Sequence, residues 1–211
     1  MVFRKRLGQL LAFFALTSCG PGQPSGEAPV EEAPAPPAVA ANPAQQRQRT
    51  ETVRRFLRWY QQAQPRLDQL LTATVRKAGQ GDTAHYQVDA ARATAYLQYL
   101  RQAGWFSPEF IDDQRQQFGR RDADFRRTRQ AYGPPVGFEY GWILYTPRPA
   151  VVVATALQRG RIDIVPGAGP QWQARVKLPG TGSLILELTD AGDSTKINTI
   201  YPSGIEQDLG Q

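Results

Sequence analysis

Residues 161–201 read RIDIVPGAGPQWQARVKLPGTGSLILELTDAGDSTKINTIY. Four segments of this stretch, 161–165, 172–178, 184–189 and 196–201, alternate or nearly alternate between apolar and polar residues. This pattern is typical of half-buried β-strands. Gly, Pro, Asp and Ser fill gaps short enough for hairpins, whereas parallel strands need long crossovers. The sequence therefore predicts an antiparallel meander. Two apolar runs before it, 138–145 and 151–157, are expected to be strands as well.

The preceding residues, 50–133, carry the helical spacing of apolar side chains instead. Four helices are expected. The first runs from Thr50 to a break or kink at Pro65, and the second covers 67–75 and is stopped by Gly79 and Gly81. The third covers about 83–103 and ends at Gly104, and the fourth starts at Ser107, Pro108 and Glu109, with Gly119 as a candidate break. Helices followed by strands predict the α+β class.

The N-terminus has the layout of an export signal. Three cations, Arg4 to Arg6, precede an apolar stretch, 7–16, that is too short to span a bilayer. The chain continues with Leu16-Thr17-Ser18-Cys19, which resembles the bacterial lipobox. The resemblance implies cleavage after Ser18 and a lipid on Cys19. An ordinary secretory signal with an incidental cysteine is the alternative.

This resemblance implies that the protein is held in the cell envelope by its lipid, with the outer membrane favoured in a Gram-negative host because Gly20 follows the cysteine. Cys19 is the only cysteine, so no intrachain disulfide can form. The expected organisation is a signal peptide at 1–18, a lipidated cysteine and Pro/Ala-rich tether at 19–49, one α+β domain at 50–205 and a tail at 206–211. An extended tether of this kind reaches up to ~75 Å.

Two short patterns link the domain to a known group. Phe56-Leu57-Arg58-Trp59-Tyr60 falls in the opening helix and Thr195-Lys196-Ile197-Asn198-Thr199-Ile200 in the closing strand. Together they resemble bacterial cystatin-like or nuclear-transport-factor-2-like domains. The resemblance implies a curved antiparallel sheet with N-terminal helices packed on it over a pocket. It implies no single activity, because that fold hosts isomerases, hydratases, immunity proteins and pure binding modules.

The residues needed for common catalytic and metal sites are scarce. His85 is the only histidine, so a tetrahedral zinc site would need several carboxylates. No serine lies in a Gly-x-Ser-x-Gly elbow, and no glycine-rich stretch reads as a phosphate-binding loop. Glu139 and Asp163 are the only carboxylates of the early expected strands, and neither spacing is diagnostic. We therefore predict no catalytic residue, no metal site and no cofactor, and an enzyme is disfavoured.

Two groups of side chains are candidate binding sites, each with a purely structural alternative. Aromatic residues of the opening helix and an early expected strand could line a ligand pocket or pack in the core: Trp59, Tyr60, Tyr140 and Trp142. Arginines of the fourth helix could form a patch for an anionic partner: Arg115, Arg120, Arg121, Arg126, Arg127 and Arg129. The neighbouring Asp112, Asp113, Asp122 and Asp124 favour local ion pairs instead, such as Asp122 with Arg126.

The lead hypothesis from sequence is a non-catalytic lipoprotein domain that contacts the membrane through its lipid and binds an envelope protein or an anionic ligand. A small-molecule pocket protein, or a weak isomerase or hydratase, is the second hypothesis. An immunity-type protein that neutralises a toxin is the third. The net charge is +6, and the excess of arginine in the helical half, 50–133, is a mild bias towards anionic partners. Nucleic acid is not expected as a partner, chiefly because the protein is exported.

Overall fold

The computed structural model describes residues 42–180 and 182–204. The expected signal peptide, Cys19, most of the expected tether and the expected tail lie outside the described residues. Within them, helices precede a four-stranded antiparallel sheet, so the predicted α+β class is confirmed. No helix in this part of the chain is long and apolar enough to cross a membrane.

The sheet is the meander that the alternating segments predict. Its strands β3 (Arg161–Pro166), β4 (Trp172–Leu178), β5 (Gly182–Ala191) and β6 (Ser194–Ser203) pair in sequence order, each antiparallel to the next. Val176 lies opposite Leu184, and Leu186 lies opposite Ile200. These four side chains are fully or almost fully buried. One face of the sheet is therefore the floor of the hydrophobic core.

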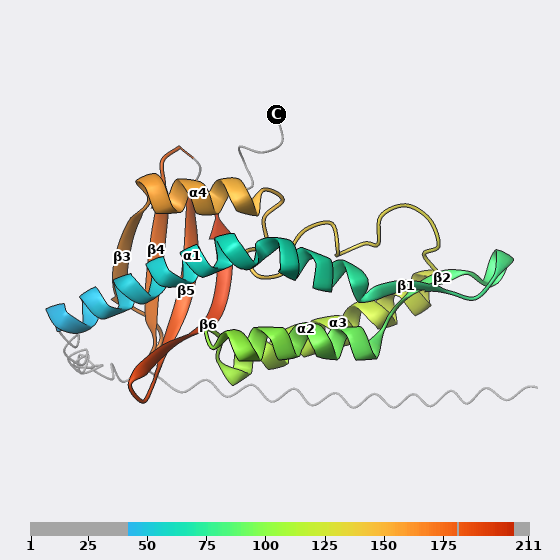
Figure 1. Cartoon of the computed structure of the whole chain (residues 1–211), viewed down its shortest axis with the longest axis horizontal. Coiled ribbons are helices and arrows are strands. Elements are labelled where there is room, and N and C mark those ends of the chain that lie inside the picture. Colours follow the sequence, from blue (N-terminus) through green and yellow to red (C-terminus); the bar gives the residue numbers. More distant parts are fainter. Residues whose placement is uncertain (1–41, 181, 205–211) are drawn as a thin grey trace, which may run out of the picture. The chain divides into compact units, whose positions relative to one another are not determined.

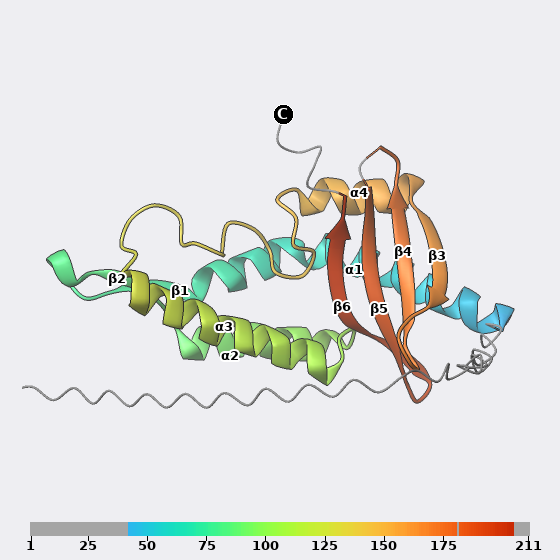
Figure 2. The same ribbon diagram turned by 180° about the vertical axis from the view of Figure 1, so that it is seen from behind.

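Helices α1 (Pro43–Ala73) and α4 (Pro149–Arg159) pack on that floor. Figure 1 shows both helices in front of the strands, and Figure 2 shows the opposite face of the sheet with no helix drawn over it. From α1, the residues Val53, Phe56 and Leu57 are completely buried. The open face carries polar side chains, among them Arg175 and Gln173, which hydrogen-bond to each other at 2.8 Å.

The remaining elements extend away from the sheet, as both views show. Strands β1 (Val75–Ala78) and β2 (His85–Val88) form a hairpin around the short 3-10 helix η1 (Gly81–Thr83). Helices α2 (Ala90–Ala103) and α3 (Pro108–Thr128) then pack against each other. The link between them joins the edge of the sheet, because the Ser107 N–H donates to the Ile197 carbonyl at 2.9 Å.

Several expected helix boundaries are confirmed and others are wrong. Gly104 ends α2 in the left-handed conformation (φ 74°), and Ser107 caps α3 by accepting from the Phe110 N–H at 3.2 Å. However, α1 begins at Pro43 with Asn42 as its cap, two turns before the expected cap Thr50. It also continues through Pro65, and α3 continues through Gly119.

Three stretches have a different structure from the one expected. The helix expected over 83–103 is a strand up to Val88 followed by α2. Residues 138–145, expected to be a strand, form bends and turns. The apolar run 151–157 lies in α4, where Val152, Val153 and Ala156 are buried and Val151 is 59% exposed. This one-sided burial is the period of a helix, and Pro149 stands at its first turn.

Candidate functional site

The four aromatic residues expected to line a pocket are divided between the core and the surface. Tyr60 and Trp142 are each 1% exposed. The Trp142 indole N–H donates to the Gly137 carbonyl at 2.7 Å, and its ring centroid lies 4.6 Å from that of Phe118. Trp59 packs instead against Phe56 and its neighbours. Tyr60, Trp142 and most of the Trp59 ring therefore pack in the core, which was the structural alternative.

Tyr140 is 42% exposed and lines a cavity of about 250 Å³ together with Asp68 and Glu139. Glu139 accepts from the Gly137 N–H at 2.7 Å, and the Gln64 amide donates to Asp68 at 3.4 Å. Burial raises the pKa of the Tyr60 hydroxyl above its ordinary value, and the nearby Asp68 carboxylate adds to the effect. Tyr60 therefore stays neutral at physiological pH.

The arginines expected to form an anionic-partner patch lie along and just after α3, and most pair with carboxylates of the same helix. Arg126 lies 2.5 Å from Asp122, as predicted, and Arg127 lies 2.7 Å from Asp124. Arg121 also reaches Asp124, and Arg115 pairs with Asp112. Arg120 lies on the exposed surface of α3, and Arg129 caps its C-terminal end. Helix α3 contains five acidic and five basic residues, so its surface is a balanced mixture of charges.

Asp122 has a second, structural role. Its carboxylate also accepts from the Val88 N–H at 2.9 Å, which ties α3 to strand β2. Asp122 therefore connects α3 to β2 and also compensates the charge of Arg126. This geometry supports the structural interpretation of the α3 charges.

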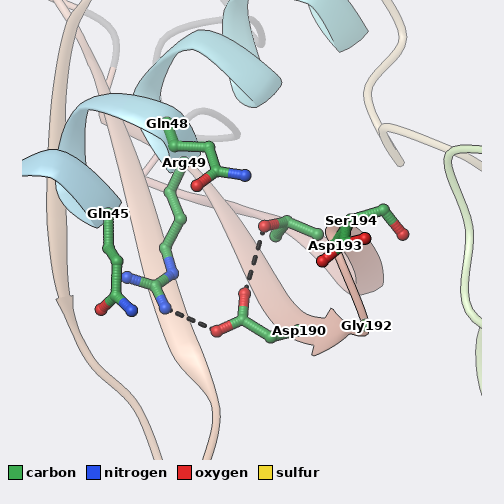
Figure 3. Close-up of a pocket in the computed structure, with 8 residues that line it drawn as sticks. Gln45, Gln48, Arg49, Asp190, Gly192, Asp193 and Ser194 are labelled. Carbon is green, nitrogen blue, oxygen red and sulfur yellow. Dashed lines mark hydrogen bonds and ion pairs between the residues drawn. The ribbon is translucent and has the colours of Figure 1, made fainter.

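A polar cavity of about 290 Å³ lies where the start of α1 faces the turn between β5 and β6 (Figure 3). We call it the Arg49 pocket, and it is lined by Gln45, Gln48, Arg49, Asp190, Gly192, Asp193, Ser194 and Thr195. The turn is made by Gly192 and Asp193, between the paired residues Ala191 and Ser194. Gly192 has a φ of 59°, a conformation that favours glycine.

Arg49 is the central side chain of this pocket and is only 4% exposed. It lies on the buried face of α1, because it precedes the buried Val53 by one helical turn. The guanidinium carbon lies 4.1 Å from the ring centroid of Trp172 on β4, within cation–π range. Its Nη2 atom lies 2.5 Å from an Asp190 carboxylate oxygen. The charge of Arg49 is therefore stabilised by the ring of Trp172 and by the carboxylate of Asp190.

Two donors of Arg49 have no partner among the described residues. The Nε and Nη1 atoms are buried and make no hydrogen bond there. A buried donor without an acceptor costs about 1–3 kcal/mol. Asp190, in contrast, is fully engaged on its two sides, because its other oxygen accepts from the Thr195 hydroxyl at 3.1 Å. The pocket thus contains an arginine with unused hydrogen-bonding capacity.

Sequence reasoning missed this pocket because residues up to 49 were assigned to the tether. A signal was present: Asn42-Pro43 is a cap followed by proline at the first helical position, and Arg49 falls on the same stripe as Val53 and Phe56. What the sequence lacks is any indication that the β5–β6 turn lies beside this helix. Arg49 and Asp190 are 141 residues apart in the chain.

No group of three or more His, Cys, Asp or Glu residues within 42–180 and 182–204 is arranged to hold a metal ion. The comparisons with known proteins point to no function: the chain shows no significant match to any protein-family model, to any curated protein or to any solved structure.

Proposed function

We propose that this protein is an exported lipoprotein, anchored in the cell envelope through a lipid on Cys19, whose folded part is a non-catalytic domain that binds an envelope component. The single observation that carries the binding role is the Arg49 pocket, with its buried and incompletely satisfied arginine. The lipobox-like sequence at 16–19 supports the anchored location. We also propose that the domain is of the cystatin-like or nuclear-transport-factor-2-like kind.

The pocket favours binding over catalysis for a chemical reason. A general acid or base needs a carboxyl, imidazole or similar group that is free to exchange its proton with a substrate. The inner carboxylate, Asp190, is already engaged by Arg49 and Thr195. The pocket's other carboxylate, Asp193, is exposed at the tip of the turn, so no buried carboxyl is left to exchange a proton with a substrate. The remaining side chains are amides and hydroxyls, which are suited to recognition by hydrogen bonds.

Two measurements on cells that express the chain test the two halves of this proposal. Metabolic labelling with a palmitate analogue should label the protein, and Cys19→Ala should abolish the label and release the protein from the membrane fraction. Affinity capture from solubilised envelopes should recover a component with the wild type, and Arg49→Lys should recover less of it. Ser18→Ala serves as the control for the first measurement, because a small residue remains at that position. An unlabelled wild type, or capture that does not depend on Arg49, would contradict the proposal.

A second candidate function is binding of a small molecule in the Tyr140 cavity. The specific observation in its favour is that two carboxylates, Asp68 and Glu139, lie beside an exposed aromatic ring there. Tyr140→Ala should then weaken ligand binding without lowering stability, because the ring is exposed. A ligand screen by thermal shift in which wild type and Tyr140→Ala respond alike to every compound would remove this candidate.

A further inference from the structure

The lining of the Arg49 pocket combines donors and acceptors in nearly equal supply. Gln45 and Gln48 each offer an amide N–H₂ and a carbonyl oxygen. The Ser194 hydroxyl donates to the Ala191 carbonyl at 3.0 Å, so its oxygen is available as an acceptor. Asp193, at the exposed tip of the turn, offers carboxylate oxygens. A matching ligand must therefore both donate and accept several hydrogen bonds over a small area.

The charges of the pocket argue against an anionic ligand. The positive charge of Arg49 is compensated by Asp190 at 2.5 Å. Asp193 has no ion-pair partner among the described residues, so the formal net charge of the lining is −1. A phosphate or carboxylate ligand would approach this negative charge at close range. A neutral polar ligand avoids the repulsion and can still use every donor.

The unused donors of Arg49 specify one element of the ligand. Nε and Nη1 need an acceptor oxygen, and both atoms are sealed from solvent in the observed rotamer. A rotation of the terminal torsions would turn one of these N–H groups towards the pocket, where a hydroxyl oxygen could accept from it. Binding would then satisfy a buried donor that is unsatisfied in the free domain.

We infer that the Arg49 pocket binds a neutral, polyhydroxylated ligand, namely a carbohydrate unit of the cell envelope. Vicinal hydroxyls supply donors to Asp193 and acceptors to the amides of Gln45 and Gln48. The cavity of about 290 Å³ is at the lower end of the range for ligand sites, about 300–1,000 Å³, which suits one or two sugar rings. This inference rests on the proposed function, because it names the class of envelope component that the domain binds.

The test is a titration of the full chain, purified in a detergent without a sugar headgroup, with three neutral probes and one anion. The probes are tri-N-acetylchitotriose, maltotriose and lactose, and the anion is inorganic phosphate. Calorimetry measures the Kd, and amide chemical shifts locate the site. At least one sugar is expected to bind and to shift the Gly192 and Thr195 amide signals, whereas phosphate is expected to bind more weakly than that sugar.

Two variants identify the contacts. Gln48→Ala removes an exposed side chain and should raise the sugar Kd about fivefold, the equivalent of one ordinary hydrogen bond. Arg49→Lys keeps the positive charge but loses the planar guanidinium, and it should raise the sugar Kd at least as much. Gln61→Ala, on the exposed side of the same helix, is the matched control and should leave the Kd unchanged. If Arg49→Lys fails to fold, Gln48→Ala still decides the question.

The outcomes separate this inference from the proposed function. If no sugar binds, or if phosphate binds more tightly than every sugar, the carbohydrate inference is overturned. The proposed function still stands in that case if envelope capture depends on Arg49. If a sugar binds but Gln48→Ala and Gln61→Ala behave alike, the site lies elsewhere and the inference is again overturned. Cys19→Ala should bind sugar like the wild type, because it changes none of the residues that line the pocket.

Discussion

Removal of the Asp190 side chain should destabilise the protein far more than removal of its partner. Arg49 is 4% exposed, whereas Asp190 is 45% exposed. In Asp190→Ala the largely buried guanidinium loses the one carboxylate that pairs with it among the described residues. In Arg49→Met the half-exposed Asp190 is hydrated, and the two unsatisfied N–H groups of Arg49 disappear with the side chain.

The magnitudes follow from the burial. Loss of one partner from a fully buried ion pair costs about 3–5 kcal/mol. Because Asp190 is only half buried and Trp172 still faces the cation, we expect about 2–3 kcal/mol for Asp190→Ala. For Arg49→Met we expect about 0–1 kcal/mol, since methionine fills part of the same space. The double variant should resemble Arg49→Met, which corresponds to a coupling energy of about 2–3 kcal/mol.

Urea denaturation of the four proteins measures these free energies, and thermal melts provide an independent check. A loss of 1 kcal/mol lowers the Tm by about 2–4 °C in a domain of this size, so Asp190→Ala should melt about 4–12 °C below the wild type. Asp124→Ala is the matched control. Its partner Arg127 is 77% exposed, so loss of this surface pair should cost at most about 1 kcal/mol.

Two results would refute the reasoning. One is an Asp190→Ala protein within about 0.5 kcal/mol of the wild type, since an unpaired buried cation must cost more than an ordinary surface change. The other is an Arg49→Met protein that is as unstable as Asp190→Ala, which would mean that the pair acts through packing rather than charge.

Three further predictions concern other parts of the fold. Burial raises the pKa of Tyr96 above its ordinary 10.0, so the stability that its neutral hydroxyl contributes is fully present below pH 10 and is lost as the pH rises further. Tyr96→Phe should therefore show a flatter fall in Tm above pH 10 than the wild type. Hydrogen bonds from Lys177 and Arg161 hold the pKa of Asp163 below 3.8, so its stabilising effect is present above that pH and lost in acid; Lys177→Met should move the NMR titration of the Asp163 carboxyl to higher pH, and an unchanged midpoint would count against this ion pair. Ser107→Ala removes a helix cap and a 2.7 Å hydrogen bond to Asn198, and urea denaturation should show a loss of about 1–2 kcal/mol; a change under 0.5 would contradict it.

The sheet could be predicted from the sequence because its signals are local. Alternation places every second side chain on one face, and the short gaps permit only antiparallel neighbours. Strand β4 has the predicted bounds, Trp172–Leu178. Gly104 and Ser107 could also be placed at helix ends from the sequence, because these roles depend on backbone conformation and on neighbours within one turn.

The wrong assignments arose where local preference and tertiary packing disagree. Val151, Val152 and Val153 are β-branched and favour strands when considered alone. In the fold they open α4, because two of them and Ala156 can be buried together against the core only with helical spacing. Tertiary burial outweighs propensity differences of less than about 1 kcal/mol per residue.

The sequence by itself determined the α+β class, the antiparallel meander of the last four strands, and the prediction that Cys19 anchors the protein. Each of these depends on composition or on neighbours a few residues apart. Only the tertiary structure brought Arg49 to Asp190 and Trp172, buried Tyr60 and Trp142 in the core, and paired most of the α3 arginines within their own helix. The physical reason is that a binding site depends on distances between residues far apart in the chain. Those distances are set by how the helices pack on the sheet.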